Sequence, residues 1–313
     1  MAVFRRKGEW LEVVVPDAWQ GQTVEAVLAG PLRVPARLRR AWLREARVVV
    51  GTHPARPDEA LAAGARLRLH AFAPEDYGVN PEPHPIEVLY EDDHVLVVNK
   101  PAGMIVHPDR PGGGGTLANA VAYHYLLNGI AAKPRHIHRL DRDTTGVVLY
   151  AKHPWAHAVL DAELRERCVR REYVALVAGR LRKKRGTLRF PIARDRKNRQ
   201  RRCVSPAGQP AVTHYEVLET FRDATLVRAW LETGRTHQIR VHFAHIGHPL
   251  MGDVLYGGPP APLGRQALHA WRVTFSHPLT RSWETVEAPW PDDLQAAVAD
   301  ARAAGKGEAP PDG

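Results

Sequence analysis

The stretch HIHRLDRDTTGVVLYAK, from His136 to Lys152, is the part of the sequence on which the fold prediction depends. Its first half is polar and contains two acids, Asp141 and Asp143, among arginines and threonines. Its second half, VVLYA, is a continuous apolar run typical of a buried β-strand. A polar cluster at the mouth of a buried strand is a common place for a catalytic carboxylate, although an ordinary charged turn has the same composition.

Two later segments combine regular structure with reactive side chains. RREYVALVAG, from Arg170 to Gly179, predicts a strand that contains Tyr173, for which simple packing is the alternative role. GRTHQIRVHFAHIGHP, from Gly234 to Pro249, predicts a loop that leads into a helix crowded with arginine and histidine. Strand-like and helical segments alternate from residue 89 to about residue 291, so we expect a domain that contains both.

The histidines of the last segment do not form a convincing metal site. His242, His245 and His248 are spaced by three, but no acidic fourth ligand lies beside them and no HExxH pattern is present. The two cysteines, Cys168 and Cys203, belong to no paired motif and cannot form a disulfide framework. We therefore predict no metal.

Residues 11–72 predict a small separate module. The run LEVVV indicates a strand, and a helix is expected from Val34 to Arg47, with Pro35 at its start. Arginines repeat on this helix at steps of three or four and predict a basic stripe: Arg37, Arg40, Arg44 and Arg47. A Pro-rich acidic linker at residues 73–88 separates the module from a catalytic domain at residues 89–291. Residues 292–313 are expected to be a partly disordered tail.

Composition limits the classes of protein that are possible. The chain of 313 residues is 44% hydrophobic and 25% charged, which is ordinary for a water-soluble protein of two domains. No apolar run approaches the roughly 18 residues of a membrane span, and the first residues do not resemble a signal peptide. We therefore expect a cytoplasmic protein with no membrane partner.

The charge is unevenly distributed. Lysine and arginine outnumber the acids by 44 to 34, a net charge of +10. The segment Arg180–Arg202 contains twelve basic residues and one acid, so its +11 exceeds the charge of the whole chain. We call this segment the basic arm. A solvated loop is the ordinary role of such a run, but its place directly after the Tyr173 strand favours a surface that grips a nucleic acid.

Taken together, these segments resemble the RluA-type family of RNA pseudouridine synthases. The family motif His-Arg-Leu-Asp-x-x-Thr-Ser-Gly is matched from His138 to Gly146, and VNKPAG, GRTHQIR and HPLMGDVLYG are similar to further family motifs. The resemblance runs from about Pro81 to Pro291. The N-terminal module resembles the S-four-like RNA-binding module. Two departures are visible: Thr145 replaces the usual serine, and Arg171 stands where lysine usually precedes the tyrosine by two residues.

The resemblance implies a fold and a set of site residues. It implies an α+β domain with the pseudouridine synthase fold, in which a mixed, largely antiparallel central sheet is flanked by helices and loops, plus the small α/β module. It also makes Asp141 the catalytic aspartate, Tyr173 the active-site tyrosine and Arg240 the basic partner of the aspartate. We further expect RNA contacts from the loop, the basic arm and the module: His138, Arg139, Arg142, Arg196, Lys197, Arg199, Arg201, Arg202, Arg40 and Arg44.

The implied reaction converts uridine to pseudouridine after the target nucleotide is flipped out of its stack. Isomerisation needs no redox partner or energy source, so no cofactor is expected. The most plausible substrate is large-subunit ribosomal RNA, as free RNA or in a precursor particle, and the enzyme is expected to be a monomer. Three alternatives stay open at this point: a transfer RNA enzyme, a non-catalytic ribosome-assembly factor, and a carboxylate-based glycoside or nucleoside hydrolase. The last is the weakest, because nothing suggests that Asp141 and Asp143 face each other across one bond.

Overall fold

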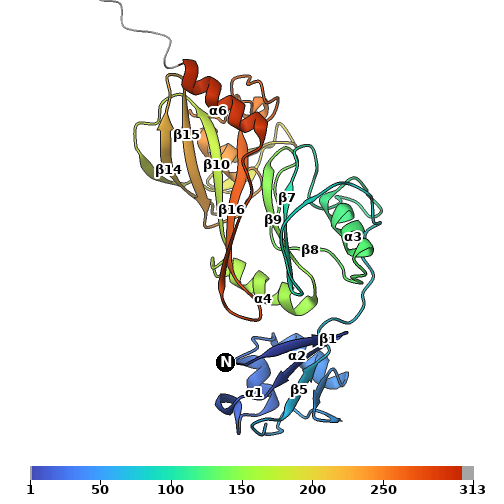
Figure 1. Cartoon of the computed structure of the whole chain (residues 1–313). Helices are drawn as coiled ribbons and strands as arrows, with labels where there is room; N and C mark the ends of the chain where they lie inside the picture. The colour runs from blue at the N-terminus through green and yellow to red at the C-terminus, as the bar shows by residue number, and fades with distance from the viewer. Residues whose placement is uncertain (1, 305–313) are drawn as a thin grey trace, which may run out of the picture.

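The computed structural model describes residues 2–304, which form a small N-terminal module and a larger domain built on one sheet (Figure 1). Within these residues the module has five antiparallel strands, in the order β1-β2-β5-β3-β4, and two short α-helices. Its elements are β1 (Phe4–Lys7), β2 (Trp10–Val14), the 3-10 helix η1 (Asp17–Trp19), α1 (Val24–Ala29), α2 (Ala36–Arg44), β3 (Val48–Val50), β4 (His53–Pro54) and β5 (Arg66–Leu69).

Helix α2 covers the core of the module with one face, as its pattern predicts. Trp42 is 2% exposed and packs among the alternate apolar residues of β2 and β5, whereas Arg40 and Arg44 are exposed. The helix is shorter than the predicted span, because Pro35 is its N-cap and Ala46 adopts a positive φ of 54° just beyond its end. The module also starts before residue 11, since β1 pairs with β2.

The larger domain is organised around a ten-stranded sheet. Its main path runs β11-β14-β15-β10-β16-β9-β7-β6, with β17 paired to β16 and β8 paired to β9. Among the described strands of this sheet only β9 and β16 run parallel, so the expected mixed, largely antiparallel sheet is confirmed. Its strands are β6 (Glu87–Glu91), β7 (Val95–Lys100), β8 (Arg135–His136), β9 (Thr145–Ala151), β10 (Arg170–Ala178), β11 (Arg185–Arg189), β14 (Val212–Thr220), β15 (Ala224–Leu231), β16 (Leu268–Ser276) and β17 (Trp283–Glu287).

Strand β9 lies in the middle of the core. All seven of its residues are buried, as the apolar run in the sequence predicts. At its start Gly146 has a φ of 113°, and a Cβ there would lie 2.1 Å from the carbonyl oxygen of Ala270 in β16. Only glycine permits this close approach. The contact fixes the loop before β9, which contains Asp141, against the neighbouring strand.

Four helices and one 3-10 turn complete the described part of this domain. They are α3 (Leu117–Leu127), α4 (Pro154–Arg165), α5 (Gln238–His245), η2 (Val254–Tyr256) and α6 (Asp292–Ala304). In Figure 1 α3 lies beside β7 and β8, and α6 lies across the end of β10, β15 and β16. Helix α6 falls in the segment expected to be a tail. Leu294, Ala297 and Val298 pack into an apolar cluster with residues of β10 and β15, so the ordered domain extends past residue 291. The expected disorder at the end of the chain concerns residues 305–313, which lie outside the described range.

The segment between module and domain is extended, as expected of a linker, but it is fastened along its path. The amide of Glu75 donates to the carbonyl of Ala131 at 2.8 Å, and the amide of Glu82 donates to the carbonyl of Asn119 at 3.1 Å. The module itself packs on α4. Trp155 of α4 joins the core of the module, and its indole nitrogen donates to the carbonyl of Leu32 at 2.9 Å.

The basic arm has more regular structure than a loop. It supplies β11 at the edge of the sheet and then a separate two-stranded hairpin of β12 (Ile192–Arg194) and β13 (Arg202–Val204). Residues 196–200, which form the tip of this hairpin, are exposed. Within residues 2–304, none of the helices combines the length and the apolar character that a membrane crossing requires.

Candidate active site

A cleft of about 1150 Å³ opens where the three conspicuous sequence segments meet. The loop before β9 contributes Asp141, β10 contributes Tyr173, and the start of α5 contributes Arg240. These residues are far apart in the sequence, and the fold brings them to one surface as the prediction requires. Arginines predominate among the charged residues of the lining, so the cleft presents positive potential to a polyanion.

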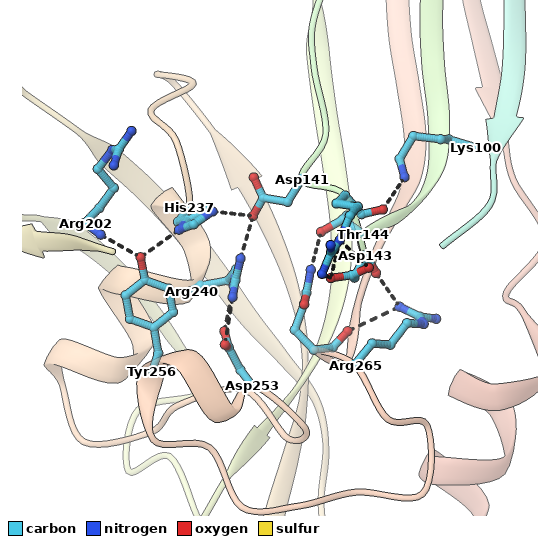
Figure 2. A network of polar contacts seen from close by, with 12 residues as sticks. Lys100, Asp141, Asp143, Thr144, Arg202, His237, Arg240, Asp253, Tyr256 and Arg265 are labelled. Atoms are coloured by element: carbon cyan, nitrogen blue, oxygen red, sulfur yellow. Dashed lines mark hydrogen bonds and ion pairs between the residues drawn. The ribbon is translucent and has the colours of Figure 1, made fainter. Parts of the chain in front are cut away.

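Asp141 and Arg240 form an ion pair at the centre of the cleft. Nη1 of Arg240 donates to Oδ2 of Asp141 at 3.1 Å, while Nε and Nη2 donate to the two oxygens of Asp253 at 2.7 and 2.8 Å (Figure 2). Burial alone would lower the pKa of Arg240, but the hydrogen bonds and charges of Asp253 and Asp141 outweigh it and raise that pKa. The guanidinium is therefore a fixed cation that holds the Asp141 carboxylate.

His237 and Tyr256 complete this side of the site. The amide of Arg202 donates to the hydroxyl of Tyr256 at 2.9 Å, and the same hydroxyl hydrogen-bonds Nδ1 of His237 at 2.8 Å. Nε2 of His237 then lies 3.9 Å from Oδ2 of Asp141. His237 has a positive φ of 59° at the N-cap of α5, a strained conformation of the kind found at functional sites. Figure 2 shows this chain of contacts leading from the basic arm to the carboxylate.

On its other side, the loop of Asp141 is held by its backbone. Lys100 is fully buried, and its ammonium donates to the carbonyls of Pro101, Met104 and Arg142 at 2.6–2.8 Å. Burial lowers the pKa of Lys100 to about 7, against the opposing effect of Asp143 and Asp141.

Arg265 holds the same loop from a second direction. Its Nη1 donates to the carbonyl of Asp143 at 3.2 Å, while Asp293 of α6 accepts from Nε and Nη2 at 2.7 and 2.9 Å. The amide of Gln266 also donates to the hydroxyl of Thr144 at 3.1 Å. The position of Asp141 is therefore determined by contacts with strand β7 and helix α6 as well as with α5.

Tyr173 lines the cleft from β10 with only 4% of its surface exposed. Burial raises the pKa of its phenol, with Arg171 lowering it and Asp141 raising it by their charges. The register of β10 against β16 shifts between Glu172 and Tyr173, a bulge of the kind that redirects side chains beside active sites. The phenol is thus a neutral aromatic surface beside the carboxylate.

The predicted RNA contacts occupy three different places. Arg139 and Arg142 are exposed at the cleft, next to Asp141 in sequence. His138 is buried; its Nε2 accepts from the amide of Leu149 at 3.3 Å, so it supports the loop of Asp141, and a phosphate contact through its ring is not favoured. Of the five predicted arm residues, Arg202 lines the cleft, Arg201 packs its guanidinium over the ring of Tyr256 at 5.3 Å, and the others are on the hairpin tip: Arg196, Lys197 and Arg199.

Arg40 and Arg44 lie on the module, which contacts the domain through α4 rather than through the cleft. Figure 1 shows α2 below α4, on the side of the molecule away from α6. A role for this helix in RNA binding would therefore concern a part of the RNA beyond the target nucleotide.

Several residues of the site could not be assigned from the sequence alone. Lys100 lies in the motif VNKPAG, and Asp253 and Tyr256 lie in HPLMGDVLYG, but nothing in their sequence context indicates what they contact. Arg265 lies in neither motif. Gln238 orders the backbone before α5, because its amide oxygen accepts from the backbone nitrogen of Arg235 at 3.0 Å. Among residues 2–304 no group of three or more histidine, cysteine or acidic side chains is placed to hold a metal ion.

Comparisons with known proteins agree with this geometry. Residues 94–245 match the family model described as RNA pseudouridylate synthase. A Bacillus subtilis protein named uncharacterized RNA pseudouridine synthase YhcT is 44% identical over 292 residues, 93% of this chain and 97% of that protein. The ribosomal large subunit pseudouridine synthase D of Pseudomonas aeruginosa is 42% identical over 297 residues, 90% of this chain and 92% of that protein. Among solved structures, human RNA pseudouridylate synthase domain containing 1 has a TM-score of 0.56 at 26% identity and covers 74% of this chain and 98% of its own.

The fold and the cleft are thus those of an isomerase that acts on RNA. The chain belongs to the RNA pseudouridylate synthase family, as the resemblance of its motifs predicts.

Proposed function

We propose that this enzyme converts specific uridines of large-subunit ribosomal RNA to pseudouridine, with Asp141 as the catalytic carboxylate. The ion pair between Asp141 and Arg240 supports this role more than any other observation. It fixes an ionised carboxylate in a half-buried position, and two cationic or polar neighbours, Arg240 and His237, keep it directed into the cleft. Relatives named ribosomal large subunit pseudouridine synthase D, at about 40% identity, support ribosomal RNA as the substrate.

The reaction requires that one bond of the nucleotide be exchanged for another. The bond between N1 of uracil and C1′ of ribose breaks, and its electron pair leaves with the base as a uracil anion. The base turns, C5 bonds to C1′, the proton on C5 is lost and N1 gains a proton, so that substrate and product are isomers. Asp141 assists at the sugar, either by bonding C1′ or by accepting a sugar proton, and both roles need the ionised carboxylate that Arg240 holds.

Tyr173 supplies the surface for the flipped base. Stacking of a base on an aromatic side chain is worth about 1–3 kcal/mol, which offsets part of the cost of removing the uridine from its helix. Because burial raises its pKa, the phenol stays neutral at physiological pH and does not repel the uracil anion. Arg139, Arg142 and the basic arm are the proposed phosphate contacts around this base.

The experiment that tests this function maps pseudouridine chemically in all transcripts of a deletion strain and of wild type. We expect one or a few ribosomal positions to lose the modification, and Asp141→Asn to restore the protein without restoring the modification. Modification lost from transfer RNA instead would replace the proposed substrate and keep the reaction. A growth defect fully rescued by Asp141→Asn would support a non-catalytic assembly factor. Size-exclusion chromatography and cell fractionation would test the expected cytoplasmic monomer.

A further inference from the structure

The side chain of Arg171 is a buried cation that has no hydrogen-bond or ion-pair partner among residues 2–304. The residue is 8% exposed, and its Nε atom is sealed from solvent with no acceptor. A guanidinium is a permanent cation, and burying one without a counter-charge is costly unless another group compensates for it. The role of this residue is therefore not explained by the contacts of the free protein.

Two of the acids that line the cleft, Glu232 and Asp141, are already engaged by other cations. Glu232, which lines the cleft near Arg171, is bound by Arg167 and by Nε2 of His214. Asp141 is bound by Arg240. The neighbouring ring of His138 cannot be a counter-charge, because an imidazole is either neutral or cationic; burial and the charge of Arg171 lower its pKa to about 3, so it is neutral. Arg171 lines the cleft, and no acid of the described residues 2–304 forms an ion pair with it.

The place of Arg171 indicates which part of the RNA it meets. It precedes Tyr173 by two residues on β10, and both side chains line the cleft. A Cβ on Gly234, in the loop on the far side, would lie 2.9 Å from Nη1 of Arg171, so the guanidinium is pressed between the strand and this loop. Backbone phosphates are bulky and stay hydrated, and exposed arginines such as Arg139 are available for them at the rim. Because Arg171 is buried beside Tyr173, we expect the inserted base, and not a backbone phosphate, to contact it.

We propose that Arg171 donates hydrogen bonds to a ring carbonyl oxygen of the flipped uracil and stabilises the negative charge that develops there during the reaction. When the N1–C1′ bond breaks, the electron pair left on N1 is shared by conjugation with the carbonyl oxygens O2 and O4. A buried cation close to either oxygen gains most of its electrostatic energy at that moment, because the charge does not exist in the bound substrate. This inference rests on the proposed function and assigns a further catalytic residue to it.

The test combines enzyme variants with altered substrates. Single-turnover rates and RNA affinities are measured for wild type, Arg171→Met and Arg171→Lys, on target RNA with uridine, 2-thiouridine or 4-thiouridine at the modified position. Sulfur accepts hydrogen bonds weakly, so one of the two thio substitutions is expected to slow wild type and to have little further effect on Arg171→Met. Removal of such a donor costs about 100- to 1000-fold in rate in comparable sites. We expect a loss of this order for Arg171→Met, partial activity for Arg171→Lys and nearly unchanged RNA affinity for both.

Arg139→Met is the comparison variant, since it removes an exposed arginine that we propose as a phosphate contact in the same cleft. It is expected to weaken RNA binding. If Arg171→Met also weakens RNA binding and leaves the single-turnover rate at saturating RNA unchanged, the residue binds phosphate and the inference is wrong. It is also wrong if both thio substitutions slow wild type and variant equally. Thermal melts of Arg171→Met and Arg171→Lys separate these results from unfolding. A wild-type enzyme that forms no pseudouridine on any RNA would instead overturn the proposed function.

Discussion

Arg240 is shared between two carboxylates of unequal exposure. Asp253, whose side chain is 1% exposed, receives two of its nitrogens, and Asp141, whose side chain is 21% exposed, receives the third. The bidentate pair with Asp253 fixes the plane of the guanidinium, and only one direction is then left for the bond to Asp141. The buried acid thus positions the arginine, and the arginine positions the carboxylate in the cleft.

Asp253→Asn is expected to slow catalysis without contact between this residue and the RNA. The amide cannot accept both donors of Arg240, so the guanidinium shifts and Asp141 loses its orientation. Small displacements of a catalytic group can cost about 100-fold in rate. We expect a loss of that order in the single-turnover rate with unchanged RNA affinity. Arg240→Lys, which keeps the charge but cannot form the fork, should show the same pattern; a rate for Asp253→Asn within twofold of wild type would contradict the positioning role.

Helix α6 is expected to contribute to catalysis as well as to stability. Asp293 binds Arg265 in a fork, and Arg265 in turn donates to the carbonyl of Asp143 in the loop of Asp141. Asp293→Asn should therefore lower the melting temperature and reduce the turnover rate by about 3- to 10-fold through a looser loop. Asp292→Asn is the matched control, because this neighbouring acid is exposed. Equal effects of the two variants would show that the contact with Arg265 does not matter.

The sequence carries enough information to predict the centre of the site but not its supports. Asp141, Tyr173 and Arg240 lie in motifs that resemble those of the family, and the fold brings all three to one cleft. Lys100 supports the same site through three backbone carbonyls, one of them 42 residues away in the sequence. Every residue has a backbone carbonyl, so no pattern of side chains in the sequence indicates such a contact.

Weakly apolar segments were the main source of error in the fold prediction. Helix α6 is rich in alanine and acid, and its buried face consists of Leu294, Ala297 and Val298. The spacing of these three is that of a helix, but so small an apolar face is indistinguishable from a solvated tail without the partner surface. The basic arm was similar, because its charges concealed the short strands β11, β12 and β13.

The basic arm is expected to determine the salt dependence of RNA binding. The slope of log affinity against log salt should become flatter by about 0.7 for each RNA phosphate that the arm no longer contacts. The variant that tests this replaces five cationic side chains of the arm by neutral ones: Arg196, Lys197, Arg199, Arg201 and Arg202. The guanidinium of Arg201 packs over the ring of Tyr256, so Arg201→Gln alone should in addition slow catalysis, whereas changes at the hairpin tip should affect binding alone. Fluorescence anisotropy at several salt concentrations measures the slope. Arg302→Gln, on α6, removes a charge elsewhere and should leave the slope unchanged. An unaltered slope in the arm variant would show that the arm does not bind RNA phosphates.

Acid is expected to destabilise the fold at pH values well above those at which carboxylates titrate. Burial lowers the pKa of His94 and of His269 to about 4 and that of His138 to about 3, from an ordinary value of 6.5. Between these values the unfolded chain binds protons that the folded chain does not, so stability is complete above pH 6.5 and falls as the pH falls toward 4. A shift of one unit is worth about 1.4 kcal/mol, so each histidine is expected to cost about 2 kcal/mol at pH 5.

Urea unfolding at pH 7.5 and at pH 5 measures this loss, and substitution of one histidine should remove its share. His94→Asn keeps a polar group near His153, its hydrogen-bond partner, but cannot take up a proton. The difference in unfolding free energy between the two pH values should therefore shrink by about 2 kcal/mol in this variant. His53→Asn is the control, because this histidine is exposed on the module. The unfolding free energy of this variant should depend on pH as that of wild type does. If His94→Asn and His53→Asn lose the same free energy between pH 7.5 and pH 5, the buried imidazole of His94 does not cause the acid sensitivity.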